Sequence, residues 1–242
     1  MEEKEKQDFS PEGIAKKYGI DLDKLKQEQI KLAKTLELKD NIDFKLADKI
    51  GAIGNTYFKN KIVSGAVILS PSMEILFQEY SSDILRFPYI SGFRAYRELP
   101  AMIEALGKLD EKPDVVFVEG HGISHPRLGL ASHFSIASGI PTIGVSDSLL
   151  PETVVEGEDI LLNGKKVGKV LKSKTNSKPL YVSPGNLISI KTAYELAKKF
   201  IVEPHKFPEP IHIVRKYAKK TRDELFMANS DNHKENSECS GD

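Results

Sequence analysis

Two short apolar runs separated by a helical stretch constrain the fold of this chain more than any other feature. They are DVVFVEG (residues 114–120) and PTIGVSDS (residues 141–148). Continuous apolar runs of this length are typical of strands buried on both faces of a sheet. The stretch between them, residues 127–139, is rich in small residues and predicts a helix. This region therefore predicts parallel-type strands alternating with helices.

Upstream, the pattern predicts three consecutive strands at residues 52–58, 63–70 and 74–81, separated by short turns. Their proximity in sequence favours an antiparallel meander. Helical periodicity or capping signals predict five further helices, at residues 10–18, 22–37, 93–109, 189–200 and 212–226.

The Asn163–Gly164 pair predicts a hairpin over residues 159–173, because both residues tolerate the left-handed backbone of a tight hairpin turn. Residues 178–185 predict another strand, followed by a helix that either Asn186 or Ser189 caps. Together the elements predict an α/β fold with a mixed sheet and helices on both faces, the architecture of ribonuclease-H-like nucleases among others.

The composition gives little guidance on partners. The 35 Lys and Arg residues balance 35 Asp and Glu residues, so any basic surface must be local. The single cysteine, Cys239, excludes an intrachain disulfide framework. The N-terminus is charged and no apolar run approaches the roughly 20 residues of a membrane helix. We expect a soluble, cytoplasmic protein.

The stretch VEGHGISHPRLGLASH, residues 118–133, carries the densest candidate chemistry. Glu119 ends a buried strand, and ligands of open α/β sheets lie beyond the carboxyl ends of strands. A carboxylate there could hold Mg²⁺. Gly120 and Gly122 would let backbone N–H groups approach a base or a phosphate closely. The alternative is a tight turn with a solvated acid.

Two neighbouring segments have both a functional and a structural interpretation. Arg127 could clamp a phosphate while His125 anchors the loop, or the pair could simply begin a helix. In FPYISGFRAYRE, residues 87–98, Tyr89 and Ile90 could wedge into a base stack. They could equally be core residues.

In their order and spacing, these segments resemble the endonuclease V family, which nicks nucleic acid near deoxyinosine or inosine. The resemblance runs from about residue 27 to residue 218. It implies a ribonuclease-H-like domain over residues 1–226, with a helical extension at 1–40, and leaves 227–242 as a disordered polar tail. It also implies DNA or RNA with deaminated purines as the substrate, and Mg²⁺-dependent cleavage, with Mn²⁺ as an alternative ion.

Carried over position by position, the resemblance assigns a base pocket and part of a catalytic centre. Gly92, Gly120, Gly122 and His125 match the positions around a flipped hypoxanthine. Tyr89 and Ile90 match the wedge, and Arg127 lies beside them. Glu98 matches a catalytic glutamate.

Other catalytic positions differ from the family pattern. The first metal-binding aspartate falls on Gly54, or on Asn55 with a shift of one residue. Where the family has its second aspartate, this chain has Glu119. Where the family has a lysine and a histidine, this chain has Asp147 and Asn186. Losing a carboxylate removes charge that a hard cation needs.

Two hypotheses from different classes follow. The first is a nuclease with catalytic residues Glu98, Glu119 and Asp147, the first two being the metal ligands. The second is a catalytically inactive protein that still binds deaminated nucleic acid through the pocket and a basic C-terminal helix, whose cations are Arg215, Lys216, Lys219, Lys220 and Arg222. A weaker third option is a structural subunit that binds a protein partner.

Overall fold

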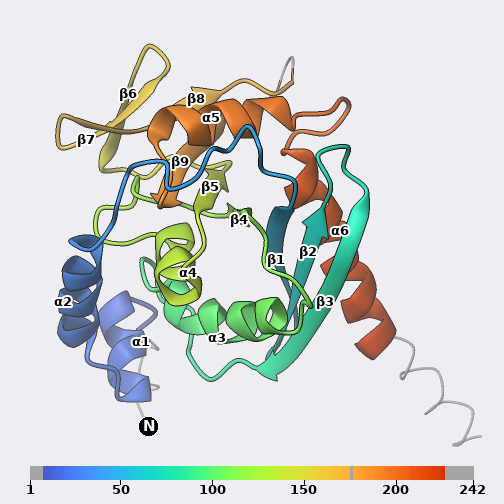
Figure 1. The fold of residues 1–242 in the computed structure, drawn as a ribbon. Helices are drawn as coiled ribbons and strands as arrows, with labels where there is room; N and C mark the ends of the chain where they lie inside the picture. Colours follow the sequence, from blue (N-terminus) through green and yellow to red (C-terminus); the bar gives the residue numbers. More distant parts are fainter. Residues whose placement is uncertain (1–7, 175–176, 227–242) are drawn as a thin grey trace, which may run out of the picture.

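The computed structural model describes residues 8–174 and 177–226, in which nine strands form one mixed sheet (Figure 1). The strands are β1 (Ile50–Phe58), β2 (Lys61–Leu69), β3 (Ile75–Ile84), β4 (Val115–Glu119), β5 (Thr142–Ser146), β6 (Thr153–Glu156), β7 (Asp159–Leu162), β8 (Lys165–Leu171) and β9 (Leu180–Asn186). The helices are α1 (Pro11–Tyr18), α2 (Leu22–Ala33), α3 (Arg94–Gly107), α4 (Leu130–Ser138), α5 (Ile190–Lys199) and α6 (Glu209–Phe226).

The strand order is β3-β2-β1-β4-β5-β9-β8-β7-β6. The first three strands form the predicted antiparallel meander, and β1, β4 and β5 run parallel. The predicted α/β fold is therefore confirmed, with the carboxyl ends of three parallel strands at one edge. The sequence pattern missed β6, a four-residue strand with three exposed residues that pairs with β7.

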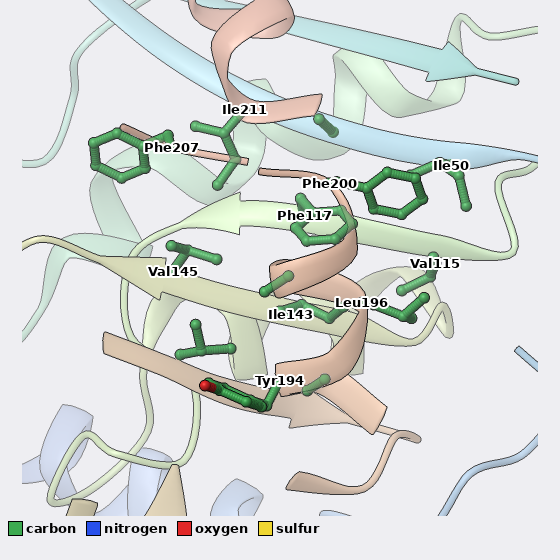
Figure 2. Packing of buried hydrophobic residues seen from close by; sticks show 14 of the residues in the cluster. Ile50, Val115, Phe117, Ile143, Val145, Tyr194, Leu196, Phe200, Phe207 and Ile211 are labelled. Atoms are coloured by element: carbon green, nitrogen blue, oxygen red, sulfur yellow. The ribbon is translucent and has the colours of Figure 1, made fainter. Parts of the chain in front are cut away.

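Helices cover both faces of the sheet, and each face has its own core. On one face α3 and α4 pack against Val116 and Val118 of β4. On the other face α5 and α6 pack against the alternate residues of the same strand, including Phe117. Figure 2 shows Phe117 beside Phe200, with ring centroids 5.9 Å apart in an edge contact. This two-sided burial explains why β4 is apolar throughout.

Turn and cap residues behave as their chemistry requires. Asn163 and Gly164 both have positive φ angles, 52° and 72°, as the predicted hairpin turn demands. Ser189 caps α5, accepting a hydrogen bond from the backbone N–H of Thr192. Asn186 does not cap this helix, and its side chain has a different partner described below.

The N-terminal helices pack against the loop that precedes α3. Ala15 of α1 and Leu22 of α2 form a small core with Ile90 and Phe93. Figure 1 shows α1 and α2 together at one side of the molecule, next to α3 and α4. The predicted disordered tail, 227–242, lies outside the described residues. No helix in the described part of the chain is long and apolar enough to span a membrane.

Candidate nucleic-acid-binding site

A cavity of about 270 Å³ lies at the carboxyl ends of β4 and β5, where an open α/β sheet places its ligands. Its walls come from the loop before α3, the loop between β4 and α4, and the loop after β5. The residues that line it include Tyr89, Gly92, Arg94, Glu119, His125 and Asp147. Ligand sites for drug-sized molecules typically enclose roughly 300–1,000 Å³, so this cavity suits a single flat base.

Tyr89 and Ile90 have opposite environments. Tyr89 is 64% exposed at the mouth of the cavity, whereas Ile90 is 1% exposed. The prediction that Ile90 shares the wedge therefore needs correction, because its side chain belongs to the core beneath the N-terminal helices. Of the two side chains, only that of Tyr89 is exposed.

The backbone carbonyl of Gly92 fixes the loop that carries Tyr89. It accepts hydrogen bonds from Gln29 Nε2 at 3.0 Å and from Arg127 Nη2 at 3.2 Å. Arg127 Nε also donates to Gln29 Oε1 at 2.6 Å, and its guanidinium lies over the Phe93 ring. Arg127 thus ties α2, the Tyr89 loop and the β4–α4 loop together. In this structure its guanidinium is occupied by protein contacts.

Gln29 was not singled out by the sequence. Its side chain is 1% exposed although it lies on a polar helix, and it uses both its amide nitrogen and its oxygen in the contacts to Gly92 and Arg127. The signal that could have found it is weak, because nothing in the pattern of α2 marks one glutamine as buried. The partner 63 residues away is visible only in the fold.

His125 presents a neutral imidazole to the cavity. Its Nδ1 accepts a hydrogen bond from the backbone N–H of Arg127 at 3.2 Å, so the ring proton resides on Nε2. Burial, followed by the nearby Arg127 cation, lowers the pKa of His125 to about 4. At neutral pH the side chain therefore offers one N–H donor and no charge.

Neither Gly122 nor Asn186 lines the cavity, and Asn186 pairs with Thr142 at the opposite end of β5. A Cβ on Gly122 would collide with the carbonyl of Pro184 in β9, so only glycine allows this close approach. The Asn186 side chain accepts a hydrogen bond from the backbone N–H of Glu37 at 2.7 Å. It thereby attaches the N-terminal extension to the sheet.

Gly54 and Asn55 face opposite sides of the sheet, as adjacent strand residues must. Asn55 faces α3, and its Nδ2 donates to Glu98 Oε2 at 2.8 Å. Gly54 faces α6, where a Cβ would lie 2.9 Å from Val214 Cγ1. Gly54 also follows Ile53, which pairs with Val118 immediately before Glu119. The position beside Glu119 therefore has no side chain, and α6 packs over it.

Glu98 accepts three hydrogen bonds, two at Oε1 and one at Oε2. Its Oε1 accepts from Tyr57 Oη and from Arg94 Nε, each at 2.6 Å, while its Oε2 accepts from Asn55. The carboxylate is 2% exposed and does not line the cavity. Freeing it would leave buried donors unsatisfied, at a cost of about 1–3 kcal/mol each.

Glu119 and Asp147 both line the cavity, and each has a cationic neighbour. Arg215 Nε of α6 lies 3.2 Å from Glu119 Oε2, and Lys206 Nζ lies 3.9 Å from Asp147 Oδ2. Both pairs are partly exposed, so neither is worth much as a stabilising ion pair. Their relevance is local, because each carboxylate already has a positive charge beside it.

This arrangement does not fit a Mg²⁺ ion held by Glu98, Glu119 and Asp147. A hard cation needs several anionic or carbonyl oxygens converging on one point. Within residues 8–174 and 177–226, the one group of three metal-ligating side chains gathered within 4.8 Å is elsewhere, on α6 and the turn before it. Instead of converging on one point, each of the three carboxylates lies beside a cationic side chain.

The close approach of Val214 to Gly54 leads to a prediction about the stability of the fold. Gly54→Ala should lower the free energy of unfolding by about 1–3 kcal/mol, because the added methyl overpacks a buried contact. In a double-mutant cycle with Val214→Ala, the penalty should shrink, since the second change opens the space. Chemical denaturation measures all four proteins. Gly107→Ala is the matched control, because a Cβ there meets nothing within 4 Å. Additive effects would contradict this packing.

The lowered pKa of His125 generates a pH prediction. The unfolded chain binds a proton near pH 6.5, whereas the folded chain does so only near pH 4. Stability from the neutral imidazole is present above pH 6.5 and is lost as the pH falls toward 4. The free energy of unfolding should therefore rise with pH between about pH 4 and pH 6.5. We expect His125→Asn to make this rise smaller, as measured by urea unfolding across that pH range. An unchanged slope would show that His125 is not protonated differently in the two states.

This chain is similar in sequence to known proteins. A family model described as Endonuclease V matches residues 30–215. The endonuclease V of Thermosipho melanesiensis is 37% identical over 204 residues, which cover 79% of this chain and 89% of that protein.

Solved structures agree with the sequence matches. The catalytic domain of human endonuclease V superposes with a TM-score of 0.78 at 25% identity, covering 84% of this chain and 96% of that one. Ciona intestinalis endonuclease V, in complex with a 23mer DNA containing an inosine followed by a ribo-adenosine, gives 0.76 at 26% identity, with 84% and 98% covered. Because the family model spans most of the sequence and the fold agrees, this chain belongs to the endonuclease V family.

Proposed function

We propose that this chain recognises hypoxanthine-containing nucleic acid and binds it without cutting it. The observation that carries the proposal is the contrast between the two halves of one site. Tyr89 and His125, which can contact a base, line the base-sized cavity, whereas the carboxylates beside it are paired with arginine and lysine side chains.

The cavity supports recognition of a flat base. Tyr89 stands exposed at its mouth, where an aromatic ring can stack on a base or fill the gap that a flipped base leaves. His125 offers a neutral N–H donor, and hypoxanthine presents acceptors at O6 and N7. The bonds from Gln29 and Arg127 to Gly92 hold the Tyr89 loop in place before any ligand arrives.

The cationic side chains support binding to the phosphate backbone. Arg215, Lys216 and Lys219 are exposed on α6, and Arg215 reaches the rim of the cavity through Glu119. Arg222 is different, because its guanidinium bonds to Asp223 and Thr56. We assign the phosphate contacts to Arg215, Lys216 and Lys219.

The family implies a divalent cation, but the donor set here argues against metal-assisted cleavage. Metal-assisted hydrolysis depends on anionic ligands that hold the ion and lower the pKa of its water. Glu119 has no carboxylate neighbour at Gly54, and Glu98 is engaged by three donors. The competing possibility is a nuclease that uses Glu98, Glu119 and Asp147 after rearrangement.

One pair of assays separates these functions. We expect the purified protein to bind inosine-containing single-stranded DNA or RNA more tightly than the adenosine equivalent. It should leave both uncut with Mg²⁺ and with Mn²⁺. Gel-shift titration and a labelled-strand nicking assay measure the two properties. Nicking that Glu119→Ala abolishes would establish the nuclease function instead, and inosine-independent binding would refute recognition of the base.

Tyr89 provides the residue-level test. Tyr89→Ala should weaken binding to the inosine strand by roughly 5- to 150-fold, since stacking on an aromatic side chain contributes about 1–3 kcal/mol. Tyr18→Ala is the matched control, because Tyr18 is 56% exposed but lies on α1 and does not line the cavity. Equal losses in the two variants would contradict a specific role for Tyr89.

A further inference from the structure

Three metal-ligating side chains gather where α6 begins, outside the cavity described above. His205 lies on the turn before α6, Glu209 is the first residue of the helix, and His212 follows almost one turn later. One ligand atom from each residue lies within 4.8 Å of the other two. None of the three lines the base cavity, and the family resemblance gives none of them a role.

The backbone holds these residues in place independently of any ion. Glu209 donates its backbone N–H to the carbonyl of Phe200, at 2.7 Å, which attaches the start of α6 to the end of α5. His205 donates its backbone N–H to Val202 at 2.9 Å, closing the preceding turn. The turn and the helix therefore bring His205 Nδ1 to 2.7 Å from Glu209 Oε2.

We propose that His205, Glu209 and His212 form a binding site for Zn²⁺, with solvent completing the coordination. Two imidazole nitrogens and one carboxylate are a ligand set that zinc accepts in proteins, with a fourth position left for water. All three side chains are partly exposed and border a surface cavity of about 730 Å³ between α6 and β3, so an ion can reach them from solvent.

The arrangement of the two rings brings two nitrogen ligands together. The His205 and His212 rings stack with their centroids 3.5 Å apart and their planes 14° apart. One ring nitrogen of each therefore lies within 4.8 Å of the other and of a Glu209 carboxylate oxygen. Imidazole nitrogen is a ligand atom that zinc commonly binds.

Two features oppose the ion, and both are local. Lys216 and Arg215 follow on the same helix and place positive charge near His212. Two imidazoles that share a tetrahedral ion must also spread apart from a stacked arrangement. Glu209 supplies the compensating negative charge, and both rings are partly exposed.

Zinc bound here would fasten the turn before α6 to the helix itself. Arg215, which pairs with Glu119 at the rim of the base cavity, lies three residues beyond His212. The metal site and the base cavity are therefore on one helix but use different side chains. The proposal does not depend on whether the chain binds or cuts nucleic acid.

Zinc titration of the untagged full-length chain tests the site. We expect calorimetry to show one Zn²⁺ bound per chain, and Co²⁺ to give visible absorption bands of a low-symmetry nitrogen and oxygen site. Both signals should be lost in His205→Ala/His212→Ala and weakened in Glu209→Gln. Zinc should also raise the melting temperature of the wild type but not of the double variant.

Two controls keep the result interpretable. Glu224→Gln removes an exposed carboxylate from the same helix and should leave zinc binding unchanged. His233→Ala/Cys239→Ser removes the histidine and the cysteine nearest the C-terminus and should also leave zinc binding unchanged. The proposal is wrong if the wild type binds no zinc, if the His205→Ala/His212→Ala variant still binds it, or if His233→Ala/Cys239→Ser abolishes it. Circular dichroism of each variant verifies folding.

Discussion

The packing of α6 over the carboxyl end of β1 determines which charged groups lie at the candidate site. Gly54 has no side chain, so Val214 can approach the strand and Arg215 can reach Glu119. A carboxylate at position 54 would have to displace that helix contact. The glycine at position 54 is thus coupled to the position of a helix 160 residues later, and the charges that lie beside Glu119 follow from that packing.

Recognition and catalysis make different demands on the same strand ends. A base pocket needs a cavity, a stacking ring and a few fixed hydrogen-bonding groups, which Tyr89, His125 and the Gly92 loop provide. Metal-assisted hydrolysis needs converging negative charge. Here the carboxylates are separated, and Arg94, Arg215 and Lys206 lie beside them.

The N-terminal helices contribute more than their polar sequence indicates. Gln29 reaches the loop before α3, and the backbone of Glu37 bonds to Asn186 at the end of β9. The first contact supports a wall of the cavity from outside the central sheet, and the second attaches the extension to the sheet. Removing the extension would take away the hydrogen bonds that Arg127 Nε and the Gly92 carbonyl make to the buried Gln29 side chain.

The sequence by itself determined the elements, because their signals are local. Periodicity, turn residues and caps depend on neighbours a few positions away, so the meander, the buried β4 and the Asn163–Gly164 turn were all predictable. It also marked Tyr89, His125 and Glu119. Only the tertiary structure decided that Ile90 is buried in a core and that Glu98 accepts three hydrogen bonds. It also decided that Arg215 lies beside Glu119 and that two histidines stack beside Glu209. The contacts of Glu98 with Asn55 and Tyr57, and of Glu119 with Arg215, join residues far apart in the sequence. Burial and stacking depend on how the segments pack, which no local sequence pattern records.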